Sequence, residues 1–137
     1  MVDSSTVVMT IDTRKPRLRI HKATIRQMGN PKYVQLMING KDRRIALRGY
    51  DRHISGLLEF RVDKQMVDSG APVDWYSAGL IADLCAAFQE IKQGNSYNLT
   101  GYIVPSERAA FFDISSLTLI EPNMGELYAR LVERFSH

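Results

Sequence analysis

Apolar residues at helical spacing predict one principal helix over residues 77–93. Its stripe consists of Leu80, Ile81, Leu84, Cys85, Phe88 and Ile91. These positions share one side of a helix because its repeat is 3.6 residues. Ser77 or Asp74 can cap the start of the helix, and Gly94 can end it. A second stripe of Leu127, Leu131 and Phe135 predicts a short C-terminal helix.

Alternating apolar and polar residues predict a β-hairpin in the first half of the chain. Residues 33–38 and 43–48 are β-type runs, and they flank Asn39-Gly40. Asn-Gly favours the positive φ angles of a tight hairpin turn. Further strands are expected at residues 7–11, as an edge strand, and at residues 17–20, 56–63, 97–104 and 109–120. Residues 22–28 have room for two helical turns.

Hairpins therefore dominate the expected order of elements, and the strands precede the principal helix. We expect an α+β fold, with an antiparallel sheet built from hairpins, one long amphipathic helix and a short C-terminal helix. The chain of 137 residues fits a single domain over residues 1–137. Within it we distinguish a basic β-rich part, residues 14–66, from an acidic helix-plus-hairpin part, residues 74–137.

Charge is distributed unevenly along the chain. Twelve basic residues and only two acidic ones lie between Arg14 and Arg52, so this stretch carries 12 − 2 = +10. The whole chain carries +3, so the remainder sums to 3 − 10 = −7. Such asymmetry creates a directed field and a candidate anion-binding face.

The basic stretch also carries a local resemblance. Residues 17–22, a short helix ending at Met28-Gly29, and the runs 33–36 and 44–47 together resemble the AbrB-like swapped-hairpin domain. That family is a small bacterial DNA-binding fold in which hairpins of two chains interlock. The resemblance implies a homodimer that presents arginines to DNA, and it covers residues 17–48 only.

The first functional hypothesis is a small regulatory protein that binds DNA through phosphate contacts. Lys and Arg neutralise phosphates and release counterions, which gives affinity with little sequence information. The candidate residues are Arg14, Lys15, Arg17, Arg19, Lys22, Arg26, Arg43 and Arg44. Two alternatives remain: a protein-interaction or assembly module with a basic face for an acidic partner, and a solvated surface that balances the acidic part of the chain.

Catalytic, metal and membrane signals are weak. The three histidines, His21, His53 and His137, have no metal-ligand spacing, and Cys85 lies on the apolar stripe of the principal helix. The apolar runs are too short to span a membrane, and the first residues are a poor secretory signal. We therefore expect a cytoplasmic, non-enzymatic protein with no catalytic residue, metal or cofactor.

Overall fold

The computed structural model describes residues 6–54 and 58–121. One sheet contains nine strands. They are β1 (Thr6–Asp12), β2 (Arg17–Ile20), β3 (Tyr33–Asn39), β4 (Arg44–Tyr50), β5 (Glu59–Arg61), β6 (Val73–Tyr76), β7 (Ser96–Val104), β8 (Ala109–Asp113) and β9 (Thr118–Leu119). The helices are α1 (Lys22–Gln27), α2 (Lys64–Asp68) and α3 (Ala78–Ala87), and the 3-10 turns are η2 (Pro105–Glu107) and η3 (Ile114–Ser116).

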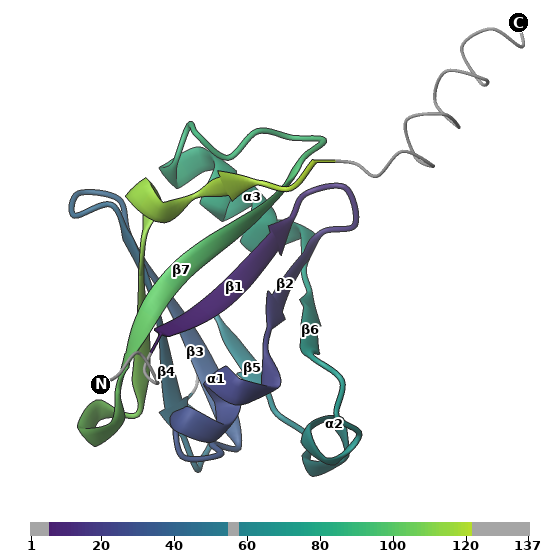
Figure 1. The fold of residues 1–137 in the computed structure, drawn as a ribbon, viewed down its shortest axis with the longest axis vertical. Helices are drawn as coiled ribbons and strands as arrows, with labels where there is room; N and C mark the ends of the chain where they lie inside the picture. The colour runs from purple at the N-terminus through teal and green to yellow at the C-terminus, as the bar shows by residue number, and fades with distance from the viewer. Residues whose placement is uncertain (1–5, 55–57, 122–137) are drawn as a thin grey trace, which may run out of the picture.

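Eight of the strands form a nearly closed, barrel-like antiparallel sheet (Figure 1). Their order is β5-β3-β4-β8-β7-β1-β2-β6. The short strand β9 pairs with Tyr97 and Asn98 of β7, beyond the part of β7 that pairs with β8. Because neighbours run antiparallel, the β1–β2 and β3–β4 turns and α3 lie at one end of the barrel. Helices α1 and α2 lie at the other. We call these the α3 end and the α1 end.

Side chains close the seam between the first and last strands of this order. In the described part of the chain, no backbone ladder joins β5 to β6. The rings of Phe60 on β5 and Trp75 on β6 stack instead, with centroids 5.4 Å apart and an interplanar angle of 28°. Both residues are paired with strand positions that face inward, Val34 and Leu18. The seam is therefore held by packing inside the barrel.

The core fills the barrel interior and is covered by α3. Every second residue of β1 faces inward, as Val7, Met9 and Ile11 do. Leu80 and Leu84 of α3 are completely buried in the same core. The alternation along the chain thus decides which residues of each strand pack into the core.

The expected fold class was wrong, because the protein is a barrel-like sheet with short helices instead of a sheet with one long helix. Helix α3 ends at Ala87, since Phe88 has an extended backbone (φ −134°, ψ 107°). Phe88 and Ile91 are nevertheless buried, so the apolar stripe identified core residues but not the end of the helix. The predicted C-terminal helix at Leu127, Leu131 and Phe135 lies outside the described residues.

The predicted hairpin is confirmed, with a different turn. Strands β3 and β4 pair in the register Ile38↔Ile45 and Asn39↔Arg44, which leaves a four-residue loop. The positive φ angle falls on Arg43 (57°) and not on Asn39-Gly40. The Asn39 side chain accepts a hydrogen bond from the backbone N–H of Asp42 at 3.0 Å, and this closes the loop.

The strand expected at residues 7–11 is also present, although it is not at an edge. Strand β1 lies between β2 and β7 and pairs with both. It therefore joins the basic and acidic parts of the sequence in one sheet, as the β4–β8 and β2–β6 pairs also do.

Gly101 on β7 provides a test of how closely β7 packs against β8. A Cβ atom there would lie well inside van der Waals contact of the Phe111 carbonyl oxygen and 2.6 Å from Cδ1 of Phe112. We predict that Gly101→Ala lowers the free energy of unfolding by about 3 kcal/mol or more. Gly79→Ala is the control, since nothing lies within 4 Å of its added Cβ in α3. That change should stabilise the protein by up to about 1 kcal/mol in urea unfolding. Equal effects would contradict the packing described.

Candidate nucleic-acid interface

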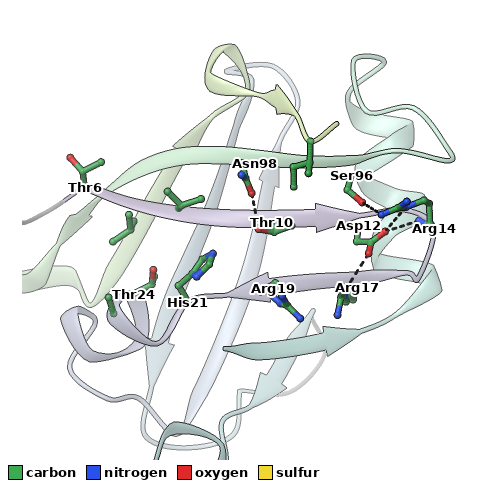
Figure 2. A pocket seen from close by; sticks show the side chains of 14 residues that line it. Thr6, Thr10, Asp12, Arg14, Arg17, Arg19, His21, Thr24, Ser96 and Asn98 are labelled. Carbon is green, nitrogen blue, oxygen red and sulfur yellow. Dashed lines mark hydrogen bonds and ion pairs between the residues drawn. The ribbon is translucent and has the colours of Figure 1, made fainter. Parts of the chain in front are cut away.

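A groove runs along the outer surface of β1 and β2, beside β7 (Figure 2). Its volume is about 610 Å³. We call it the β1–β2 groove, and define it by Thr6, Thr10, Arg14, Arg17, Arg19, Thr24 and Asn98. Seven residues of β1 extend over about 23 Å, so the groove has the length of an extended polymer segment. Thr24 of α1 borders the end near Thr6, and Arg14 borders the end near the β1–β2 turn.

Two arginines share the outer face of β2 because strand side chains alternate. Arg17 and Arg19 are two residues apart, and Leu18 between them is completely buried. The Nε and Nη2 atoms of Arg19 donate to the two carboxylate oxygens of Asp74 at 2.7 and 3.0 Å. Arg17 Nη1 donates to the same carboxylate at 3.2 Å. Asp74 lies opposite Arg19 on β6, so this strand pair fixes both guanidinium groups.

Asp12 organises the α3 end of the groove. The backbone N–H groups of Arg14 and Lys15 donate to its Oδ1 at 2.9 and 3.3 Å, and Arg17 Nε lies 3.4 Å from its Oδ2. Burial raises the pKa of Asp12, but the backbone hydrogen bonds, Ser96 and Arg17 together outweigh burial and bring the pKa below its ordinary value. Asp12 is therefore charged at neutral pH and holds the turn that carries Arg14, whose Nη2 donates to Ser96.

Two buried polar atoms of the groove have no hydrogen-bond partner among the described residues. They are Arg17 Nε and the hydroxyl oxygen of Thr24. Thr24 is 1% exposed, yet it borders the groove. Buried polar atoms nearly always find partners. Arg17 Nε nevertheless faces Asp12 Oδ2 at 3.4 Å, so the Thr24 hydroxyl is the atom of this pair that has no polar partner among the described residues.

Only three of the eight candidate residues come together in this groove, namely Arg14, Arg17 and Arg19. Arg43 and Arg44 lie at the β3–β4 turn and form ion pairs with Glu90 and Asp113.

The other three candidates are also apart from the groove. Lys15 is exposed in the β1–β2 turn, while Lys22 and Arg26 belong to α1 at the opposite end of the barrel. The twelve basic residues between Arg14 and Arg52 are therefore divided between both ends and several faces.

Ion pairs offset much of the charge that the basic stretch concentrates in sequence. The groove combines three arginines with Asp12 and the adjoining Asp74, so its charge is 3 − 2 = +1. Asp51 is held similarly by Arg108, whose Nη1 lies 2.9 Å from Oδ2, and this contact lowers the pKa of Asp51. The local field at the groove is thus weaker than the sequence indicates.

Sequence reasoning missed the partners of these arginines. The sequence predicts Asp74 as a helix cap, and Asp12, Ser96 and Asn98 are not among the predicted site residues. Thr10 and Asn98 are register partners, and the Thr10 hydroxyl donates to Asn98 Oδ1 at 2.8 Å. The alternation within β1 and β7 places each residue on a face, but it does not reveal that these two strands are neighbours.

The residues with catalytic potential do not gather. His21 borders the groove, His53 contacts Glu59, and His137 lies outside the described residues. Cys85 is half-buried, and burial raises the pKa of its thiol. Among residues 6–54 and 58–121, no group of three potential metal ligands occurs. No helix in the same ranges has the length and apolar character of a membrane span.

Comparisons with known proteins find no matching family model, no similar curated protein and no similar solved structure. The resemblance of residues 17–48 to the AbrB-like domain, and the interlocked dimer that it implies, stay predictions.

Asp74 gives the site a pH-dependent contribution to stability. The hydrogen bonds from Arg19 hold the pKa of Asp74 below the ordinary 3.8. A depressed folded-state pKa stabilises the protein above the unfolded pKa, and this stabilisation is lost as pH falls through the folded value. We predict that Asp74→Asn costs about 1–2 kcal/mol at pH 7 and progressively less below about pH 4, measured by urea unfolding.

Asp83→Asn is the matched control for this change, because Asp83 is exposed on α3 and makes no salt bridge within the described residues. It should change stability by less than about 0.5 kcal/mol at either pH. A constant cost of Asp74→Asn from pH 7 to pH 3 would contradict the role given to the carboxylate.

Proposed function

We propose that this protein is a non-enzymatic, cytoplasmic nucleic-acid-binding protein of regulatory type, and that the β1–β2 groove contacts the phosphate backbone of DNA. The observation that carries the proposal is the line of Arg14, Arg17 and Arg19 in one groove about as long as β1. Three of the candidate residues predicted from the sequence therefore line one groove: Arg14 lies in the β1–β2 turn, and Arg17 and Arg19 lie on β2.

The spacing and orientation of the arginines suit a repeating anion. Side chains two apart on a strand are separated by roughly 6.6 Å. Each guanidinium has five N–H donors, and Asp74 occupies only part of those of Arg17 and Arg19. Asp12 and Asp74 hold the guanidinium groups in place, so less side-chain entropy is lost when a phosphate binds.

The number of arginine–phosphate contacts determines how such binding should respond to salt. Three phosphate contacts give a slope of about −2.7 in the logarithm of affinity against that of salt. That is shallow for a DNA-binding protein, since slopes near −10 accompany extensive phosphate contact. Polar groups such as Asn98, which lines the same groove, would supply further contacts to sugar or bases.

The first test is a titration of mixed-sequence duplex DNA at several salt concentrations. We predict that Arg14→Gln and Arg19→Gln each weaken binding by about tenfold and reduce the salt slope by about one.

Arg43→Gln and Arg48→Gln are the controls, since both residues lie outside the groove. Their binding should stay within about twofold of the wild type at 0.15 M salt, where charges beyond about 8 Å are screened. Equal losses for all four arginine variants would indicate diffuse attraction and no groove. An absence of binding at low salt would exclude the function.

A second candidate function, an interaction or assembly module, is favoured by an apolar row on another part of the outer surface. Met37, Ala46, Phe111 and Tyr102 are register partners across β3, β4, β8 and β7. Met37 is 37% and Tyr102 47% exposed, and the rings of Tyr102 and Phe111 stack with centroids 5.6 Å apart. Exposed apolar groups in a row are typical of protein contacts.

If this row joins two copies of the chain, Tyr102→Lys should convert a dimer into a monomer in light scattering, because a charge would enter an apolar interface. The exposed Tyr76, on β6, serves as the control through Tyr76→Lys. A wild-type protein that is monomeric at all concentrations would exclude the homodimer.

A further inference from the structure

A second hollow lies at the α1 end of the barrel, between α1, residues 30–33 and the segment from Arg61 to Asp68. Its volume is about 610 Å³, which is within the range of small-molecule sites. We call it the α1–α2 pocket. It shares no lining residue with the β1–β2 groove.

Apolar side chains line the inner part of this pocket. Ile25 is completely buried and Val62 is 7% exposed. Val67 of α2 is partly buried against the same core, and Tyr33 contributes an aromatic ring at the start of β3. Such a lining favours a flat or apolar body that leaves water on binding.

Four exposed cationic residues surround this apolar lining. They are Arg26, Lys32, Arg61 and Lys64. None of them forms a salt bridge in residues 6–54 and 58–121, in contrast to the arginines of the groove. Lys32 lies near enough to Asp51 to contribute to its lowered pKa, after the larger effect of Arg108. Cations gathered around an apolar cavity without internal partners are available to an anionic ligand.

Two carboxylates reduce the charge of the pocket without cancelling it. Asp63 and Asp68 also line it, so its charge is 4 − 2 = +2. The Asp63 side chain is occupied at the start of α2, where it accepts a hydrogen bond from the Gln65 N–H at 3.1 Å. A phosphate monoester carries about −1.5 to −2 at pH 7, which matches the remaining +2.

We propose that the α1–α2 pocket binds an organic phosphate monoester with a flat, apolar body. The body lies against Val62, Val67 and Tyr33, and the phosphate is held by Arg26 and Arg61, with Lys32 and Lys64 nearby. Guanidinium groups are suited to this because their paired N–H donors match two phosphate oxygens. The site does not depend on nucleic-acid binding by the groove.

The test is a fluorescence titration of the full chain with 1-naphthyl phosphate, which combines the two ligand features. It should bind at least tenfold more tightly than 1-naphthol, which lacks the anion, and than inorganic phosphate, which lacks the apolar body. It should also bind more tightly than 1-naphthoate. Binding of 1-naphthoate with equal affinity would overturn the assignment to a phosphate monoester, and no binding of 1-naphthyl phosphate at millimolar concentration would overturn the site.

Variants locate the site on the protein. Arg26→Gln and Arg61→Gln should each weaken 1-naphthyl phosphate binding by about tenfold. Arg52→Gln should leave it unchanged, because Arg52 is exposed but does not line the pocket. All three residues are exposed, and thermal melting would verify that each variant is folded. If Arg52→Gln had the same effect as the pocket variants, the ligand would be held by general surface charge and the proposal would be wrong.

Discussion

The stacked rings of Phe60 and Trp75 hold together the two strands at which the barrel would otherwise stand open. An unpaired strand edge has free backbone groups, so packing inside the barrel must fix β5 against β6. Both candidate sites depend on these strands or on the chain that connects them. β6 carries Asp74, which orients Arg17 and Arg19, and the chain between β5 and β6 forms α2 and one wall of the α1–α2 pocket.

The ion pairs of the protein divide its basic residues into two groups. Arg17, Arg19, Arg43 and Arg44 are paired with carboxylates, three of which belong to the acidic part of the chain. Arg26, Arg61 and Lys64 make no salt bridge within the described ranges. Charge balance within the chain was one interpretation of the sequence, and it applies to the first group. The second group remains available to an external anion, at the end of the barrel where α1 separates the groove from the pocket.

Local pattern was sufficient for several features of the fold. The alternation at residues 17–20 places Arg17 and Arg19 on one face of β2, and the runs around Asn39-Gly40 form the β3–β4 hairpin. The stripe at residues 80–91 correctly selected buried residues, apart from the half-buried Cys85. The stripe did not predict the end of the helix at Phe88, because an extended backbone buries this ring as well as a continued helix would. Periodicity reports which residues are buried, whereas the end of an element depends on what it packs against.

The sequence by itself thus determined strand faces, the central hairpin, the helical segment α1 and the concentration of positive charge. Only the tertiary structure decided how those residues meet. Asp74 reaches Arg19 through the β2–β6 register, and Asn98 reaches Thr10 through β1–β7. Arg26 of α1 and Arg61 of β5 line one pocket although they are far apart in the sequence. The physical reason is that periodicity is a local property, while strand order and register depend on how all the inward faces fill one core.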